Sequence, residues 1–409
     1  MRFAHLLAAA SVAAVTATPA LAQDDDAAAD AFVKDIQIYG RVMLDQTFAG
    51  ADNADVNFTT SDARRLRIGA RGKLGDRVKW NFELNTDSSG EINAEDAWIQ
   101  FYPTGDRWSV VVGQDNTHNS FSELTSSRFL PIAERAAFTD AFQLDRRVGV
   151  SILNDGANWT AAAGIHTTNL ENGGDQEGWA ASARVTGTPV NTPEFLGHLG
   201  AHWRYRDQGS SDDDLRYRQR PLSASLDRII STGRVADSDN LFGVEAYGLF
   251  DEGRYWAGGE YVVTDANGTE PVLDEDLDFS GGQLIVGTMF GGGRTYKNGK
   301  WNRPRVDNPF GDNGYGALMI EARFDTLDLT DSAVDGGQLD TYAVNADWWL
   351  TDSVHIGATA FLADADLGTS TSGLGSDFAS LVTAGFEEEE VSGVVIRAQF
   401  DFGTPAFKF

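Results

Sequence analysis

The chain has 409 residues, no cysteine, and 61 acidic against 32 basic residues, which gives a formal net charge of −29 at pH 7. This charge disfavours nucleic acid as a partner, because nucleic-acid phosphates attract cationic surfaces. Outside one short N-terminal run the sequence has no stretch of about 18 apolar residues, so a helical membrane protein is excluded.

The N-terminus has the pattern of an exported protein. Arg2 precedes an apolar run from Leu6 to Val15, and Thr18-Pro-Ala-Leu-Ala-Gln23 supplies a small-residue cleavage site. We expect a signal peptide at 1–22, an acidic segment at 23–35 and one barrel domain at 36–409. Two soluble domains are the alternative for this length. The absence of cysteine favours a closed barrel, whose strands pair on both edges and need no disulfide.

The rest of the chain alternates apolar and polar residues in sixteen segments, an even number as bacterial outer-membrane barrels require. The predicted strands are 36–45, 64–74, 77–86, 92–102, 107–113, 146–153, 158–166, 178–187, 197–206, 241–250, 254–264, 281–290, 314–325, 339–350, 354–362 and 391–402. The predicted fold is therefore all-β: a transmembrane antiparallel β-barrel of about 16 strands with inward-folded loops, in the outer membrane of a Gram-negative bacterium. Aromatic residues near strand ends, such as Trp203, Trp348 and Trp349, are expected in the interfacial girdles.

The last predicted strand shows the alternation clearly, because Val394, Ile396 and Phe400 share one face and Arg397 and Gln399 the other. A charge facing lipid costs roughly 2 to 4 kcal/mol at mid-membrane, so the apolar face must point outward. The same rule directs a set of cations into the lumen: Arg65, Arg67, Arg71, Lys73, Arg77, Lys79, Arg204 and Arg206. Two interpretations stay open. The cations either pair with wall carboxylates and stiffen the barrel, or focus a field that concentrates small anions.

Connection lengths alternate as a barrel requires. Short connections such as 74–77 and 351–352 fit periplasmic turns, and long ones such as 114–145 and 207–240 fit external loops. The connection 291–313 is long although it falls on the periplasmic side. We expect it to fold into the lumen and to add five cations to the anion pathway, namely Arg294, Lys297, Lys300, Arg303 and Arg305.

The connection 114–145 is the candidate constriction. Its apolar residues, among them Phe129, Ile132 and Phe138, would not remain in water, so we expect it to fold into the barrel and narrow the pore. The candidate residues of this constriction loop are His118, Arg128, Glu134 and Arg135. We expect Glu134 and Arg135 to form an ion pair that pins the loop to the wall.

Acidic residues cluster at 24–26, 212–214, 274–276 and 387–390, in stretches without strand character. They are either solvated loops or surface carboxylates that bind divalent cations and bridge to lipid headgroups. A cation-preferring pore dominated by these loops is therefore an alternative.

Several motifs occur in the same order as in one known family. They include Arg64-Arg-Leu-Arg-Ile-Gly-Ala-Arg-Gly-Lys-Leu74, Glu134-Arg-Ala136, Asp145-Arg-Arg-Val-Gly149 and Val395-Ile-Arg-Ala-Gln399. In these motifs the chain resembles the phosphate-selective porin O and P family. The resemblance implies a homotrimer of sixteen-stranded barrels in outer-membrane lipid, with Arg65, Arg67 and Arg71 at positions of an arginine ladder.

One departure from that family concerns specificity. After Gln114 the family commonly has a hydrophobic residue and a lysine, but this chain has Asp115 and Asn116, which weakens the case for tight phosphate binding. The predicted function is a passive diffusion channel for small anions, such as phosphate-type oxyanions. A general or cation-preferring small-solute porin is the alternative.

Two other classes of protein, an enzyme and a secreted glycan-binding protein, fit the sequence less well. The histidines are scattered, His198 and His202 lie too far apart along one strand to chelate one metal comfortably, and no nucleophile elbow, phosphate-cradling loop or zinc spacing occurs. We therefore expect neither catalysis nor a cofactor. A secreted glycan-binding β protein is the remaining alternative, and heat-modifiable migration on unboiled gels would favour the barrel over it.

Overall fold

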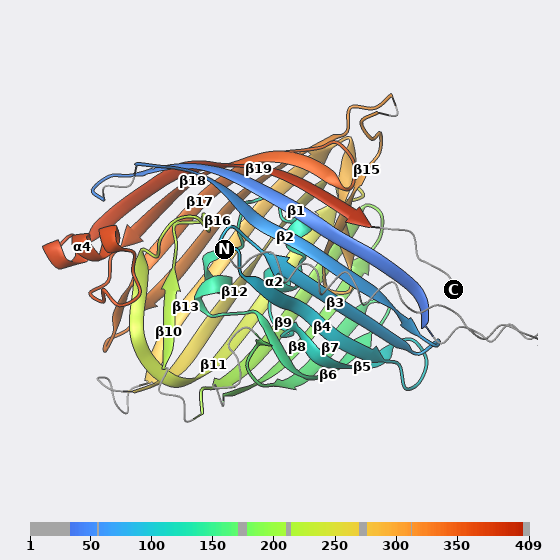
Figure 1. Ribbon diagram of the computed structural model, residues 1–409, viewed down its shortest axis with the longest axis horizontal. Coiled ribbons are helices and arrows are strands. Elements are labelled where there is room, and N and C mark those ends of the chain that lie inside the picture. The colour runs from blue at the N-terminus through green and yellow to red at the C-terminus, as the bar shows by residue number, and fades with distance from the viewer. Residues whose placement is uncertain are drawn as a thin grey trace, which may run out of the picture.

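Sixteen strands form a closed antiparallel barrel in the computed structural model (Figure 1). The described residues are 33–54, 57–170, 178–209, 214–269, 276–311 and 313–403, so the expected signal peptide at 1–22 lies outside them. The wall strands are β1 (Val33–Ala51), β2 (Asn57–Leu74), β3 (Val78–Thr86), β4 (Ile92–Phe101), β5 (Trp108–Asn116), β6 (Arg146–Asp155), β7 (Trp159–His166), β8 (Trp179–Asn191), β9 (Phe195–Asp207), β11 (Ile230–Phe250), β12 (Tyr255–Gly268), β13 (Asp276–Phe290), β16 (Ala317–Thr330), β17 (Asp335–Trp349), β18 (Val354–Asp366) and β19 (Glu388–Gly403). All sixteen predicted strands are confirmed.

The barrel closes where β1 pairs with β2 on one edge and with β19 on the other. The register places Asp45 opposite Arg397, and the guanidinium of Arg397 donates two hydrogen bonds of 2.7 Å to the carboxylate of Asp45. Closure leaves no wall strand with an unpaired edge, and this ion pair fastens the first strand to the last from inside the lumen.

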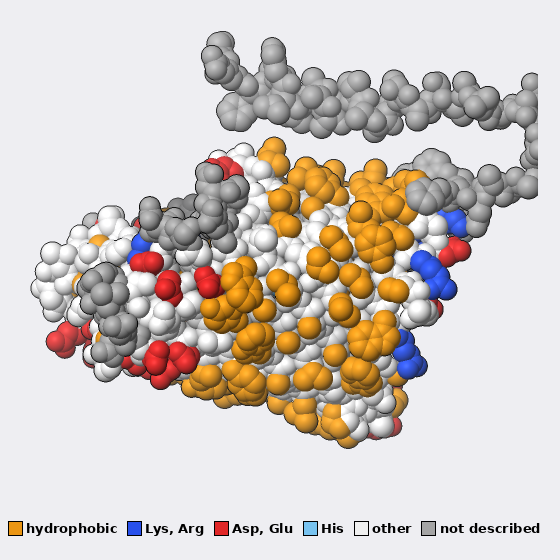
Figure 2. Space-filling model, turned by 90° about the horizontal axis from the view of Figure 1, so that it is seen from below, with side chains coloured by type: hydrophobic (Ala, Val, Ile, Leu, Met, Phe, Trp, Pro, Cys, Tyr) orange, Lys and Arg blue, Asp and Glu red, His pale blue; other side chains and the backbone are white. Residues whose placement is uncertain are grey.

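The outward faces are apolar, as the alternation predicts. Ile68 is 55% exposed while its neighbour Arg67 is 8% exposed, and Leu199 is 57% exposed while His198 is 1% exposed. Figure 2 shows the apolar side chains as a broad band across the wall, with Asp and Glu gathered toward its left end and Lys and Arg at its right end. The strands thus have the apolar outer face and the polar inner face that a membrane barrel requires. Of the helices within the described ranges, none combines the length and apolar character needed to cross a membrane.

The connections define two ends of the barrel, which we call the turn end and the loop end. The turn end has the short connections, such as 75–77 and 251–254, together with the first residues of β1 and the last of β19; the loop end has the long ones, such as 117–145. The elements outside the wall are β10 (Leu215–Gln219), β14 (Gly292–Lys297), β15 (Lys300–Val306), α2 (Phe121–Leu124), the 3-10 helix η1 (Ser127–Phe129), α3 (Ala137–Ala141) and α4 (Ser376–Ala384).

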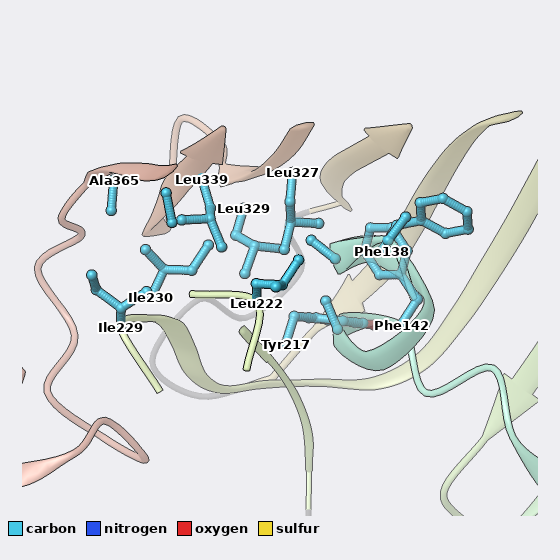
Figure 3. Close-up of a cluster of buried hydrophobic side chains, with 14 of the residues drawn as sticks. Phe138, Phe142, Tyr217, Leu222, Ile229, Ile230, Leu327, Leu329, Leu339 and Ala365 are labelled. Carbon is cyan, nitrogen blue, oxygen red and sulfur yellow. The ribbon is translucent and has the colours of Figure 1, made fainter. Parts of the chain in front are cut away.

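The lumen is filled unevenly. α3 and β10 pack against the inner side of the wall near the loop end, where Phe138 and Phe142 belong to one buried apolar cluster with Leu327 and Leu329 of β16 (Figure 3). Phe138, Phe142 and Leu327 are 0% exposed. An apolar cluster therefore fills the lumen beside β11, β13 and β16 to β18 near the loop end, and the remaining open space is lined mainly by β1 to β6.

Three expectations were wrong in detail. The short strands β10, β14 and β15 were not predicted, because they pair locally inside the barrel and carry no lipid-facing stripe. Of the acidic clusters, Asp276 begins β13 and residues 388–390 begin β19, so these residues lie within strands, whereas 24–26, 212–213 and 274–275 lie outside the described residues. Trp349 is 0% exposed and stacks on His355, with 4.1 Å between ring centroids, because the alternation that turns Trp348 outward turns Trp349 inward.

Candidate functional site: the channel and its constriction

The connection between β5 and β6 crosses the lumen, which confirms the inward-folded loop. It is anchored at its first helix by Glu260 of β12, whose carboxylate accepts hydrogen bonds from Ser120 Oγ at 2.7 Å and from the backbone N–H groups of Phe121 and Ser122, each at 2.8 Å. The carboxylate thus occupies the N-terminus of α2, where backbone N–H groups lack partners within the helix. The Glu260 side chain, from a strand distant in sequence, therefore fixes the loop to the wall.

Glu134 forms a second anchor. Its carboxylate accepts from Arg64 Nε at 2.5 Å and Arg64 Nη2 at 2.9 Å, and it lies 3.6 Å from Arg397 Nη2 and 3.9 Å from Arg65 Nη2. Its backbone carbonyl accepts from Arg323 Nη1 at 2.6 Å. Four arginines from β2, β16 and β19 therefore converge on one loop residue.

The expected ion pair between Glu134 and Arg135 is wrong. Arg135 lies 3.1 Å from the carboxylate of Glu123 and donates to the backbone carbonyls of Ser122, Glu123 and Thr125. Glu134 therefore reaches the wall, while Arg135 holds the fold of the loop itself. Glu134 nevertheless pins the loop to the wall, through other partners than expected.

Two cavities lie in the lumen: the turn-side one is lined mainly by β1 to β6, and the loop-side one lies between β2 to β6 and residues of α3, β10, β16 and β17. The loop-side chamber has a volume of about 350 Å³, and the turn-side chamber a volume of about 790 Å³. Three side chains line both chambers, namely Arg67, Arg135 and Arg146. We call these three arginines the neck, because the two chambers meet at them.

Each arginine of the neck has a carboxylate partner. Arg67 lies 3.0 Å from Glu83 and also contacts Glu95, and Arg146 lies 3.0 Å from Glu95 and 2.7 Å from Asp96. Charge-assisted pairs of this kind hold guanidinium groups in fixed positions. The neck is therefore a rigid polar opening whose positive charge is largely compensated.

The two chambers differ in charge. The loop-side chamber is lined by seven cationic and six carboxylate side chains. The turn-side chamber is lined by nine cationic and four carboxylate side chains, a formal excess of five positive charges. A protein of net charge −29 thus encloses a chamber of opposite sign.

Four cations of the turn-side chamber have no carboxylate within ion-pair distance in the described part of the chain: Arg71, Lys79, Arg128 and Lys300. Arg71 Nε donates to Gln37 Oε1 at 3.0 Å, Lys79 Nζ to Tyr102 Oη at 2.9 Å, and Arg128 Nε to Ser126 Oγ at 3.2 Å. Their partners are neutral, so their charges are available to solutes in the chamber.

The structure separates the predicted pathway residues into three groups. Arg65, Arg67, Arg71, Lys73, Lys79 and Lys300 line the chambers, with Arg128, Glu134 and Arg135 from the constriction loop. Arg204, Arg206 and Arg294 are buried elsewhere: the first two share Asp239, and Arg294 pairs with Glu321. Arg77, Lys297, Arg303 and Arg305 line neither chamber; Arg303 pairs with Asp401 and Arg305 with Asp307.

The connection 291–313 folds inward as expected. Its strands β14 and β15 form a hairpin whose Trp301 is 3% exposed and packs on Phe121 of the constriction loop, with 4.8 Å between ring centroids. Arg294 Nη2 donates to the backbone carbonyl of Phe129 at 3.0 Å. The hairpin therefore supports the constriction loop from the turn end, and Lys300 is the cation that it presents to the chamber.

His118 is 6% exposed, and burial lowers its pKa to about 3, so it is neutral at physiological pH. It lines a smaller pocket beside the turn-side chamber. Across the described ranges no three His, Asp or Glu side chains are grouped so that they could hold a metal ion.

Sequence reasoning missed Arg146 as a residue of the neck. Strict alternation in β6 places Arg147 inward, but Arg146 is the first residue of the strand and follows directly on the inward-folded loop, so its side chain reaches the lumen. The charged sequence Asp145-Arg-Arg147 at the end of that loop was the available signal.

Known proteins resemble this chain in sequence and in fold. An uncharacterized protein of Caulobacter vibrioides is 34% identical over 313 residues, which cover 70% of this chain and 59% of that protein. The chain thus matches about three-fifths of that relative's length.

Among solved structures, the anion-selective porin from Comamonas acidovorans superposes with a TM-score of 0.57 at 13% identity, covering 90% of this chain and 99% of that one. The high-pH structure of OprB from Pseudomonas putida gives 0.56 at 9% identity, covering 90% and 94%. The trimer form of OmpT from Vibrio cholerae gives 0.50 at 11% identity, covering 90% and 99%. At these identities the likeness shows the fold.

The sequence profile of one family spans nearly all of the barrel, matching residues 36–402. With the sixteen-stranded wall and the inward-folded constriction loop described above, this match shows that the chain belongs to the phosphate-selective porin O and P family of outer-membrane porins.

Proposed function

We propose that this porin is a passive diffusion channel for small anions, with phosphate-type oxyanions among its solutes. The observation that carries the proposal is the turn-side chamber, whose lining has a formal excess of five positive charges. A narrow space between low-dielectric walls strengthens such a field and raises the local concentration of mobile anions.

The unpaired cations bear most of this effect. Arg65 and Arg67 are 7% and 8% exposed and lie against Glu134, Glu83 and Glu95, so their charges are largely compensated. Arg71, Lys79 and Arg128 face the same chamber with neutral partners. Guanidinium groups match the oxygens of phosphate in geometry, and Lys79 adds a point charge. Asp115 and Asp96 share the chamber, so the preference for anions is moderate.

The test is the reversal potential of the purified full-length porin in planar bilayers across a potassium chloride gradient, with phosphate then titrated in. We expect an anion-selective sign and a dose-dependent reduction of chloride current by phosphate. The double variant Arg71→Gln with Lys79→Gln lowers the chamber's formal excess from five to three positive charges, so its anion preference should fall. A control with Arg77→Gln and Lys297→Gln removes the same charge from residues that line neither chamber, and should behave as wild type.

A cation-selective sign for the wild-type channel would overturn this proposal. It would favour the alternative in which the acidic loop end, where Asp and Glu gather in Figure 2, sets the selectivity. Equal loss of anion preference in the double variant and its control would show that net charge, rather than the chamber, is responsible.

We also propose that the porin is a homotrimer embedded in outer-membrane lipid. The trimer form of OmpT, a neighbour in fold, supports this oligomeric state. The mass of the detergent-solubilised, unheated protein measured by light scattering would decide between trimer and monomer.

A further inference from the structure

A wide apolar groove crosses the outer, lipid-facing side of the wall from β11 to β18, and its volume is about 1230 Å³. Small outward-facing residues form its floor, namely Ala246, Ala257, Gly259, Ala322 and Ala360. Larger outward-facing residues form its rims, namely Val244, Tyr261, Leu284, Val286, Tyr342 and Val344, and each of these is at least 46% exposed. The groove is therefore open to the membrane and separate from the lumen.

The groove ends toward the loop end at a single row of the strand register. Phe324, Tyr342 and Leu362, which all line it, lie directly opposite one another on β16, β17 and β18. The rings of Phe324 and Tyr342 are 5.1 Å apart between centroids. Tyrosine is favoured where an apolar region meets a polar one, because its ring is apolar and its hydroxyl group is polar. This row therefore marks the boundary between acyl chains and headgroups.

The next outward row on these strands carries carboxylates. Asp340 and Asp364 lie two residues beyond Tyr342 and Leu362, which is about 7 Å along a strand, and they are directly opposite each other. Glu390 of β19 lies opposite Asp364 in turn. Like charges that are directly opposite on neighbouring strands destabilise a sheet. Within the described ranges, none of these three carboxylates forms an ion pair or a side-chain hydrogen bond.

The same opposition of carboxylates recurs on both sides of this row. Asp265 of β12 lies opposite Asp278 of β13, and Asp366 of β18 lies opposite Glu388 of β19. We call these four residues, together with Asp340, Asp364 and Glu390, the carboxylate band. The band follows the loop-end side of the groove from β12 to β19, and its repulsion is offset only by positive charge brought from outside the wall.

The groove and the carboxylate band together limit the ligand. An apolar groove takes acyl chains, and a headgroup at the band meets negative charge, so an anionic headgroup is disfavoured. In the part of the chain that the structure describes, no three His, Asp or Glu side chains are grouped so that they could hold a metal ion. An ammonium group needs no such grouping, because its three N–H donors can each bind a separate carboxylate.

We propose that the groove binds a membrane lipid whose headgroup carries an ammonium group. The acyl chains lie between the rims, and the ammonium group donates to Asp340 and Asp364. Thr326, directly opposite Asp340, supplies a neutral hydroxyl donor for oxygen atoms of the headgroup. The site goes beyond the anion channel and does not depend on it, because none of these outward-facing residues lines either chamber.

Native mass spectrometry of the purified full-length porin is the test. Dipalmitoyl phosphatidylethanolamine is the probe, and dipalmitoyl phosphatidylglycerol, which has the same chains and no ammonium group, is the comparison. We expect the probe to bind about fivefold more tightly, which is the size of effect that exposed charge pairs give. The double variant Asp340→Asn with Asp364→Asn should lose this preference. The matched control Asp106→Asn with Glu194→Gln removes the same charge from exposed turn-end connections and should keep it.

A second variant tests the groove itself. Ala322 lies opposite Val286 and Val344 on the groove floor, so Ala322→Phe should fill the groove and weaken the binding of both lipids. Heat-modifiable migration checks that each variant is folded. If Ala322→Phe does not fold, Ala360→Phe on β18 supplies the same comparison.

Four results would overturn the inference. Two concern the wild-type porin: phosphatidylglycerol bound as tightly as the probe, or bound more tightly than the probe once magnesium is added, which would indicate an anionic lipid bridged by the metal. The third is a preference for the probe that persists in Asp340→Asn with Asp364→Asn, or that is lost equally in its control. The fourth is a lower light-scattering mass of Ala322→Phe with unchanged lipid binding, which would show that a second copy of the chain covers this face.

Discussion

Replacing Glu134 by glutamine should release the constriction loop from the wall. The carboxylate holds Arg64 by two hydrogen bonds of 2.5 and 2.9 Å and lies within 4 Å of Arg65 and Arg397, and these side chains are mostly buried. Breaking a buried ion pair typically costs about 3 to 5 kcal/mol. Glutamine keeps one acceptor oxygen, so we expect the free energy of unfolding to fall by about 2 to 3 kcal/mol.

The pH dependence of this loss follows from the pKa of Glu134. Burial alone would raise that pKa, but the guanidinium of Arg64 outweighs burial and holds the pKa well below its ordinary value of 4.5. A carboxyl group with a lowered folded-state pKa stabilises the protein above its unfolded pKa and loses that contribution as the pH falls through the folded-state value. The free energies of unfolding of wild type and variant should therefore differ by the full amount at neutral pH and become equal in strong acid.

Urea titration of the barrel refolded into lipid vesicles measures the loss, and single-channel recording detects the released loop as current fluctuations. Asp140→Asn is the control, because Asp140 lies in the same loop and pairs with Arg228 and Arg220, but its side chain is 47% exposed. Exposed pairs contribute at most about 1 kcal/mol. Equal small losses in the two variants, with steady currents in both, would refute the reasoning and leave the apolar contacts of Phe138 and Phe142 as the main anchor.

Three further outcomes are expected. Burial raises the pKa of Glu123 to about 7 against the opposing effect of Arg135, so the anion preference should be greater at about pH 6 than at about pH 8, and Glu123→Gln should remove this difference in reversal-potential measurements. Because that pKa lies above the ordinary 4.5, the folded state binds more protons than the unfolded state, and Glu123 should lower the free energy of unfolding as the pH rises from about 4.5 to about 7. If the free energy of unfolding of Glu123→Gln, measured by urea titration, changes with pH as steeply as that of wild type, this expectation is contradicted. Phe138→Ala empties a fully buried site in the lumenal cluster and should cost about 3 to 5 kcal/mol in the same titrations, whereas a loss below about 1 kcal/mol would show that α3 is not held by packing.

The sequence alone was sufficient to predict the strands of the barrel wall and their outer and inner faces. The alternation of Ile68 with Arg67, and of Leu199 with His198, placed the lipid and lumenal faces correctly, and the last strand was recognised from its own residues. These features are local, because a charge at any single outward position is unfavourable in lipid. The alternation within each strand is therefore enough to assign its outer and inner faces. The apolar residues of the constriction loop also correctly predicted that the loop folds into the lumen.

Only the tertiary structure decided which lumenal cations face water. By alternation Arg204 and Arg71 are equivalent, yet Arg204 is buried against Asp239 while Arg71 lines the turn-side chamber. The difference arises because α3 and β10 fill one side of the lumen, and because the carboxylates that neutralise an arginine come from distant parts of the chain, as Asp45 does for Arg397. Burial and pairing depend on these non-local contacts, which a periodic pattern does not encode; the charge of the pore is therefore a property of the folded barrel, whereas its inside and outside are properties of the sequence.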